Sequence, residues 1–352
     1  MKKYTMADIA KEAGVAKSTV SRYFNDGYVK EETKKKIQEV VERTGFEPSA
    51  AASNLKSKET RMIGVVVPTM TSPTTGRLLN AMDNAFRDAG YACLILTTDH
   101  HPEREISAIE YLRSMRVDGI VLVATNLSKK HQDLQLSSKI PFLVMGQRFP
   151  SGTSIIYDDY QAGLQVGEYV RRMGHNDVTY IGVNEEDNAV GHERKRGIME
   201  GLSHAASVYP ITMEETSFTY EQARETARDL LEKHVPDLFI CATDSIAMAC
   251  YKEVREKGLR VPEDVSIVGF GGYEITELLS PTMTSIRYEN ELAGRLCAST
   301  LIAMIHGEPV PTLQVVGFQF REGESVSDMR ETDQAINPSS SKTENPADSN
   351  IQ

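Results

Sequence analysis

The sequence predicts an α/β protein with a small helical head and a larger domain of two lobes, each built on a parallel sheet. Three observations predict this class. In the first 45 residues, apolar side chains recur at the spacing of one helix face. From Met62 onward, short runs rich in Val and Ile alternate with helix-like segments, as in parallel sheets covered on both faces. These runs are too many for one doubly wound sheet, so two lobes are expected.

The head is expected to hold three short helices. Apolar residues at positions 6, 9, 10 and 13 mark the inner face of the first, and Gly14 supplies the turn after it. The second covers 17–24 and ends at the breaker residues Asn25–Gly27. The third begins near Glu31. Two helices joined by a tight turn with Gly, with polar residues outside, are typical of a helix-turn-helix.

The outer face of the second helix carries the candidate DNA contacts. Lys and Arg pair with phosphates, and Arg and Ser also reach base edges. The charge distribution agrees, because residues 1–61 hold 13 Lys and Arg against nine Asp and Glu, whereas the rest of the chain holds 26 against 41. A basic head on an acidic body is expected if only the head touches a polyanion. The outward-facing residues are Lys17, Ser18, Ser21, Arg22 and Asn25.

The body is expected to alternate strands and helices. Helix-like segments lie between most of the strands, and the first of them has Leu78, Met82 and Phe86 on one face. The segment 331–352 lacks aromatic residues and is rich in Ser, Asn, Pro and Asp, so a disordered tail is expected. The expected strands are Ile63–Pro68, Ala92–Thr97, Gly119–Ala124, Phe142–Met145, Ser154–Tyr157, Val178–Val183, Leu238–Ala242 and Val265–Phe270.

No pattern for membrane insertion or catalysis is found. The longest apolar runs fall far short of the roughly 20 residues of a membrane helix, and the N-terminus lacks the apolar core of a secretory signal, so a cytoplasmic protein is expected. The phosphate-loop and dinucleotide motifs are incomplete, and His100-His101 has no third metal ligand at useful spacing. We therefore predict no enzymatic activity, cofactor or metal site. The four cysteines (Cys93, Cys241, Cys250 and Cys297) are expected to be reduced, buried thiols.

The segment from Thr5 to Arg22 resembles the head of the lac-repressor family of bacterial regulators, and the resemblance extends over residues 4 to about 330. It implies that the second helix enters the major groove. It also implies that a hinge helix enters the minor groove, where Leu55 would wedge between base steps. Ser53 departs from the family, which often has Arg there. The DNA contacts implied are Thr5, Lys17, Ser18, Thr19, Ser21, Arg22, Asn25, Thr33, Ala52 and Leu55.

The resemblance also implies a domain division. Residues 1–47 would form the helix-turn-helix domain, 48–60 the hinge and 61–330 an effector domain built like a periplasmic sugar-binding protein. Its first lobe would hold about 61–158 and 289–316, its second about 159–286 and 317–330.

The resemblance matches the family's effector-binding residues to individual positions of this chain. Arg194 matches an arginine that pairs with ligand oxygens, and Asp158 a carboxylate that accepts from sugar hydroxyls. Gly271 replaces an acidic effector contact, and the surrounding motif looks like the trehalose- and sucrose-repressor branch. Trehalose-6-phosphate binders of that branch carry arginines where this chain has Thr69 and Gln147, so an unphosphorylated disaccharide is favoured. The implied effector residues are Thr69, Ser72, Gln147, Asp158, Arg194, Thr243, Asp244 and Gly271.

The resulting hypothesis is a repressor that binds a palindromic operator as a homodimer and releases it when a disaccharide, trehalose, sucrose or a phosphate derivative, binds between the lobes. A free sugar-binding transport protein fits the body, but the missing signal and the helix-turn-helix oppose it. A sugar-processing enzyme lacks a catalytic set. A further alternative is a catabolite-type global regulator whose corepressor is a phosphorylated carrier protein.

Overall fold

The computed structural model describes residues 4–24, 27–46, 59–203 and 211–330. The chain forms two compact units, Met1–Thr60 and Arg61–Gln352, and each is described by itself. The predicted DNA contacts Asn25, Ala52 and Leu55 lie outside the described residues, as does the tail. Within the described ranges, no helix is long and apolar enough to cross a membrane.

In the described residues of the head unit, three helices lie at the positions expected from the sequence. Their inner faces enclose a small core in which Ile9 and Val20 are fully buried. The first helix begins with a capping box between Thr5 and Asp8. It ends at Gly14, whose φ of 67° suits a residue without a Cβ. The helices are α1 (Met6–Ala13), α2 (Lys17–Phe24) and α3 (Glu31–Thr44), so the expected helix-turn-helix head is confirmed.

The first lobe of the body, termed the N-lobe, is built on a parallel sheet with the order β11-β5-β4-β3-β1-β2. Both faces of the sheet are covered. Val65 packs into a core beneath α5 and α12, whereas its neighbour Val66 packs into the opposite core beneath α6. The elements are β1 (Met62–Val67), α5 (Pro73–Asp88), β2 (Ala92–Thr97), α6 (Pro102–Ser114), β3 (Gly119–Val123), α7 (Lys129–Leu136), β4 (Phe142–Met145), β5 (Thr153–Tyr157), α12 (Asn290–Ile305) and β11 (Leu313–Val316).

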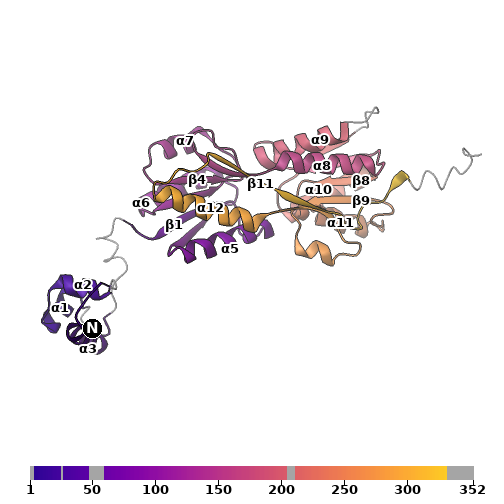
Figure 1. Ribbon diagram of the computed structural model, residues 1–352. Helices are drawn as coiled ribbons and strands as arrows, with labels where there is room; N and C mark the ends of the chain where they lie inside the picture. The colour runs from indigo at the N-terminus through magenta and orange to yellow at the C-terminus, as the bar shows by residue number, and fades with distance from the viewer. Residues whose placement is uncertain (1–3, 25–26, 47–58, 204–210, 331–352) are drawn as a thin grey trace, which may run out of the picture. The chain divides into compact units, whose positions relative to one another are not determined.

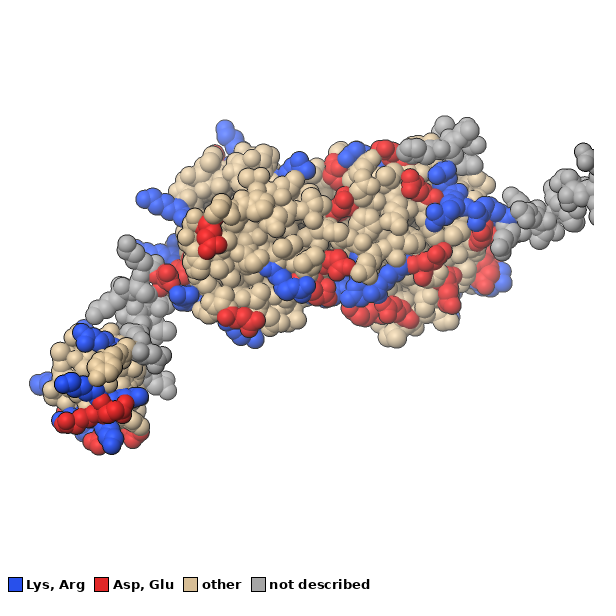
Figure 2. Space-filling view, viewed as in Figure 1, with Lys and Arg blue, Asp and Glu red and all other residues tan. Residues whose placement is uncertain are grey.

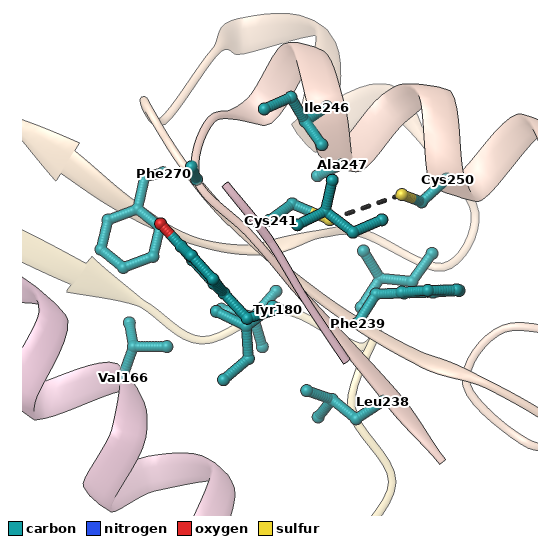
Figure 3. Packing of buried hydrophobic residues seen from close by; sticks show 14 of the residues in the cluster. Val166, Tyr180, Leu238, Phe239, Cys241, Ile246, Ala247, Cys250 and Phe270 are labelled. Carbon is teal, nitrogen blue, oxygen red and sulfur yellow. Dashed lines mark hydrogen bonds between the residues drawn. The ribbon is translucent and has the colours of Figure 1, made fainter. Parts of the chain in front are cut away.

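The second lobe, termed the C-lobe, holds the sheet β12-β10-β9-β8-β6-β7, in which β12 runs antiparallel to β10 and the other pairs are parallel. Figure 3 shows part of its core, including Tyr180, Phe270 and the free thiols of Cys241 and Cys250, whose sulfur atoms are 3.6 Å apart. The elements are α8 (Asp159–Arg172), β6 (Val178–Gly182), η1 (Asn188–Arg194), α9 (Lys195–Ser203), β7 (Ile211–Glu215), α10 (Tyr220–Lys233), β8 (Leu238–Cys241), α11 (Asp244–Glu256), β9 (Ser266–Phe270), η2 (Glu274–Leu278), β10 (Thr284–Tyr288) and β12 (Phe318–Arg321).

The chain passes between the lobes three times, after β5, β10 and β11 (Figure 1). Aromatic residues pack where these passages lie together. The Tyr157 hydroxyl donates to Asn290 Oδ1 over 2.6 Å, and the rings of Tyr157 and Tyr288 are 4.9 Å apart. The three passages therefore join the two lobes at one side. The region where the two lobes face each other is termed the lobe junction.

All eight expected strands are present, but four others were missed: β7, β10, β11 and β12. β10 is an interior, buried strand whose sequence Thr-Ser-Ile-Arg-Tyr has no continuous apolar run, and the others lie at sheet edges. β7, at the edge of the C-lobe sheet, is largely exposed and ends in two glutamates, and β12, at the opposite edge, is only partly buried. Edge strands lack the continuous apolar run that reveals a strand buried on both faces.

Candidate DNA-binding and effector sites

Five of the ten predicted DNA contacts lie on α2. Val20 holds the opposite face in the core of the head. Figure 2 shows Lys and Arg side chains around much of the visible face of the head, with acidic side chains between them. A face of this kind can reach both phosphates and base edges. The exposed predicted contacts on α2 are Lys17, Ser18 and Arg22, and the half-buried ones are Thr19 and Ser21.

Two further predicted contacts lie at helix starts. Thr5 caps α1: its Oγ1 donates to Asp8 Oδ2 over 2.6 Å and accepts from the Asp8 backbone N–H over 3.3 Å. Thr33 lies half-buried in the first turn of α3. Helix N-termini attract phosphate groups, so both positions suit a backbone contact. Thr5 also has a capping role that the sequence analysis did not assign.

Arg194 lies buried in the C-lobe at the end of η1, with 5% of its surface exposed. Its Nε and Nη2 donate to Asp159 Oδ1 over 3.0 and 2.5 Å, and its Nη1 donates to the carbonyl of Ala242. The guanidinium also lies over the rings of Phe270 and Tyr288, 4.9 and 5.2 Å from their centres. Among the described residues these bonds engage three of the five N–H groups that an arginine carries.

Glycines on facing helices bring Arg194 to Asp159. A Cβ on Gly163 of α8 would lie 2.2 Å from the carbonyl oxygen of Arg194, and one on Gly197 of α9 would lie 2.1 Å from that of Tyr160. Both distances are far below any van der Waals contact. The backbones of α8 and of η1–α9 can approach this closely only because both positions lack side chains.

Asp158 and Asp159 have different roles. Asp158 is half-buried and caps α8, since its Oδ1 accepts from the Gln161 backbone N–H over 3.3 Å. Asp159 is buried and accepts from Arg194 and from the Tyr288 hydroxyl, 2.7 Å away. The residue predicted to accept from a sugar is Asp158, whereas the acid that the structure pairs with the arginine is its neighbour.

Asp244 is fully buried at the start of α11. It accepts from the Tyr273 backbone N–H over 2.8 Å and from the Ser285 hydroxyl over 2.6 Å. Burial raises its pKa from 3.8 to about 6. Its neighbour Thr243 caps the same helix through Ile246 N–H, at 3.3 Å. Asp244 therefore organises the loop that follows β9.

Gly271, in that loop, has a φ of 145°, in the region that favours glycine. A Cβ there would lie 2.5 Å from Cε1 of Tyr273 and 3.1 Å from Asp244 Oδ2. The Tyr273 ring thus lies where a longer side chain at 271 would begin. An acidic residue at this position does not fit the loop as it is folded.

Arg77 of α5 reaches from the N-lobe to this loop. Its Nη1 donates to the carbonyl of Gly272 over 3.0 Å and its Nη2 to that of Gly271 over 2.8 Å. It also pairs with Glu274 over 2.7 Å. A buried guanidinium bound to one loop in this way is a direct link between the lobes.

Gln147 makes a second link. Its Nε2 donates to the carbonyl of Thr125 in the N-lobe over 2.9 Å and to Asp187 Oδ1 in the C-lobe over 3.1 Å. Asp187 also caps η1, and burial raises its pKa from 3.8 to about 6. Gln147 thus binds a residue of the opposite lobe, which its neutral amide permits.

The remaining junction contacts lie at the outer edges. His100, after β2, stacks on Phe218, after β7, with ring centres 5.1 Å apart and planes at 10°. The predicted Thr69 and Ser72 follow β1 and are half-buried; Thr69 lies 2.9 Å from the hydroxyl of Thr71, and Ser72 lies 2.7 Å from that of Thr74. The lobe junction is therefore lined by hydroxyls and amides on one side and by carboxylates and Arg194 on the other.

Family models match both units of the chain. One, described as periplasmic binding proteins and sugar binding domain of LacI family, covers residues 60–329, and the other, bacterial regulatory proteins of the lacI family, covers residues 5–49. The chain belongs to the lacI family. This lacI-family protein is a DNA-binding transcriptional repressor with a domain of the sugar-binding type, and it is not an enzyme.

Two relatives of the lacI-family chain illustrate the match. It is 36% identical to the sucrose operon repressor of Staphylococcus xylosus over 87% of this chain and 95% of the relative. It is 28% identical to the transcriptional regulator DegA of Bacillus subtilis over 81% of this chain and 86% of the relative.

Solved structures share the fold of the lacI-family chain. The lac repressor dimer bound to operator and the anti-inducer ONPF superposes with a TM-score of 0.83 at 20% identity, over 93% of this chain and all of the other. A complex of the regulator CelR with cellobiose gives 0.69 at 24% identity, over 92% and 99%. The expected head and two-lobed body are thereby confirmed.

Four residues of the junction escaped the sequence analysis: Arg77, Asp159, Asp187 and Tyr288. Asp159, Asp187 and Tyr288 lie at the carboxyl end of a strand or up to five residues after it, and Arg77 lies on the helix that follows β1. That position was the available signal, because ligands of open parallel sheets bind outside the carboxyl ends of strands. It does not show which strand ends of two separate sheets meet.

Proposed function

We propose that this lacI-family chain is a sucrose-responsive repressor: it binds operator DNA and loses affinity for it when an unphosphorylated sucrose-type disaccharide binds at the lobe junction. The observation that carries the proposal is the 36% identity to a sucrose operon repressor over nearly the whole of both chains. The guanidinium of Arg194 and the half-buried carboxylate of Asp158 suit neighbouring sugar hydroxyls.

The charge of the junction supports a neutral ligand. The arginines Arg77, Arg194 and Arg287 lie there, and each is paired with a carboxylate. Three further carboxyls, those of Asp158, Asp187 and Asp244, lie at the junction or beside it, so negative charge exceeds positive charge. Thr69 and Gln147 are neutral. A dianionic sugar phosphate would bring charge into a site already rich in carboxylates, which is unfavourable.

A dimer that reads a palindromic operator is part of the proposal, as is a location in the cytoplasm. A groove of about 550 Å³ on the C-lobe, lined in part by Tyr220, Met248 and Leu279, supports the dimer. Leu278 and Ile275 beside it are 80% and 51% exposed. Apolar surface of this kind is typical of an interface. Light scattering on the purified chain measures the assembly.

The effector is tested by dye-monitored thermal unfolding with sucrose, trehalose and trehalose-6-phosphate. A ligand at 100 times its Kd stabilises a protein by about 2.7 kcal/mol, which is roughly 5–10 °C in Tm for a domain of this size. A rise with sucrose is expected. A rise with trehalose-6-phosphate alone would contradict the neutral-ligand argument, and no rise with any sugar would favour the protein-corepressor alternative.

The head assignment is tested by Arg22→Ala. Arg22 is exposed on the outer face of α2, so its loss is expected to weaken operator binding at least tenfold, the equivalent of about 1–3 kcal/mol for a base-reading arginine. Sugar binding is expected to stay unchanged. The measurement is fluorescence anisotropy with labelled operator, and Lys36→Ala, on the exposed side of α3, is the control. Equal operator affinity in wild type and Arg22→Ala would refute the assignment.

A further inference from the structure

Tyr180 of β6 has a buried hydroxyl with no hydrogen-bond partner among the described residues. Its side chain is 2% exposed. Such groups are rare in folded proteins, because burying an unpaired hydroxyl is costly. The chain pairs other tyrosine hydroxyls of the body: those of Tyr157, Tyr169, Tyr251 and Tyr288 donate to Asn290, Glu322, the carbonyl of Ser280 and Asp159. The Tyr180 hydroxyl therefore calls for a physical account.

The hydroxyl lies at the end of β6 that faces the junction. A Cβ on Gly182, the last residue of the strand, would lie 2.9 Å from the Tyr180 hydroxyl oxygen and 2.5 Å from Cε1, so the ring extends along the strand toward its carboxyl end. Figure 3 shows the hydroxyl oxygen beside Phe270. The Arg194 guanidinium lies over that same Phe270 ring, at 4.9 Å. Glycine at 182 leaves the space that the hydroxyl occupies.

A hydrogen bond between the two lobes is anchored near the same end of β6. Asp187, which accepts from Gln147 of the N-lobe, follows Gly182 by five residues. Separation of the lobes would break this bond near the carboxyl end of β6. Burial also raises the pKa of Tyr180, so the group stays a neutral hydroxyl that can both donate and accept.

We propose that the Tyr180 hydroxyl is a further effector contact, which exchanges hydrogen bonds with a hydroxyl of the neutral sugar that Arg194 holds. The inference rests on the proposed function. It adds a ligand-binding group from the interior of a strand to a set drawn from loops and helix ends. It also gives the unpaired hydroxyl a reason: the folded chain keeps it without a partner until the sugar supplies one.

The test is Tyr180→Phe in the full-length chain, because this change removes only the oxygen atom. Sucrose affinity, measured by titration calorimetry, is expected to fall about 3- to 10-fold, the equivalent of one hydrogen bond between neutral groups. The Tm without sugar is expected to stay the same or to rise, because an unpaired buried hydroxyl destabilises the fold. Tyr169→Phe is the matched control: that tyrosine is equally buried, but its hydroxyl bonds to Glu322 over 3.0 Å. It is expected to lower Tm and leave sucrose affinity unchanged.

The outcomes separate the two proposals. If wild type binds sucrose and Tyr180→Phe binds it equally well, the Tyr180 inference is overturned and the proposed function stands. A lower Tm of Tyr180→Phe without sugar would show that the hydroxyl is bonded within the unliganded protein, which also overturns the inference. If wild type binds neither sucrose nor trehalose, the proposed function fails and the Tyr180 inference falls with it.

Discussion

The two lobes of the body are built alike but line their junction differently. Each has a six-stranded, mostly parallel sheet with helices on its faces. The N-lobe contributes the neutral side chains of Thr69, Ser72 and Gln147 together with Arg77, which bonds to the loop after β9. The C-lobe contributes Arg194 and Asp159, which are buried and bonded to each other.

This difference indicates which side of the lobe junction is rigid before a ligand binds. A buried ion pair with several hydrogen bonds holds its groups in one arrangement, because moving either would leave a charge uncompensated. Rearranging hydroxyls at half-buried loop positions costs little free energy. We therefore expect the Arg194–Asp159 side of the junction to keep its arrangement, and the hydroxyls of Thr69 and Ser72 on the N-lobe side to rearrange more easily.

The largest effect is expected when the buried ion pair of Arg194 and Asp159 is broken. Arg194→Ala leaves the buried Asp159 without its partner, which is expected to destabilise the fold by about 3–5 kcal/mol. The release of operator by sugar is expected to be lost as well. Urea unfolding and operator anisotropy measure the two effects. The control is Arg260→Ala, which removes an exposed pair with Asp264 and is expected to change stability by less than about 1 kcal/mol.

The next prediction concerns the close approach of α8 to η1 and α9, which places Arg194 beside Asp159. Gly163→Ala places a methyl group against the Arg194 carbonyl, a backbone atom that cannot swing away, and is expected to cost about 3 kcal/mol. Gly76→Ala in α5 of the N-lobe is the control, because Gly76 is exposed and its Cβ position is open. That control is expected to gain roughly 0.5–1 kcal/mol from helix propensity. Equal thermal stability of the two variants would contradict the close packing of α8 on α9.

Arg77→Gln tests the contact that joins the N-lobe to the C-lobe across the junction. Arg77 is 13% exposed and bonds to Gly271, Gly272 and Glu274, so its loss is expected to cost about 2 kcal/mol, the scale of hydrogen bonds to a charged group. Sugar dissociation is expected to become faster because the lobes part more readily. Stopped-flow release of sugar measures this. Glu274→Gln keeps the carbonyl bonds and is expected to have a smaller effect on both quantities.

The smallest effect concerns pH. Because burial raises the pKa of Asp187 from 3.8 to about 6, the folded chain holds this proton more tightly than the unfolded chain. The stability this group contributes is full below pH 3.8 and is lost as pH rises through 6. In Asp187→Asn, the change in unfolding free energy between pH 5 and pH 7.5 is expected to shift by about 1 kcal/mol relative to wild type. Urea titrations at both pH values measure it; an identical pH dependence would contradict the raised pKa.

Much of this architecture followed from local sequence. The head helices were predictable because a short amphipathic helix shows its buried face at a fixed spacing, as Ile9, Ala10 and Ala13 do. The eight strands found from sequence have runs of Val and Ile because helices cover both faces of their sheets. The effector positions were expected only from the resemblance to the lac-repressor family, because no local pattern indicates them.

Only the tertiary structure decided how those residues are used. Two neighbouring aspartates look equivalent in the sequence, yet Asp158 caps a helix and Asp159 meets Arg194, because α8 begins between them. Arg77 lies 194 residues before the Gly271 whose carbonyl it binds, and only the passage of the chain between two sheets brings them together. Spacing along the chain determines which face of a helix or strand is buried. Contacts between separate sheets depend on how their strand ends meet, which no local pattern encodes.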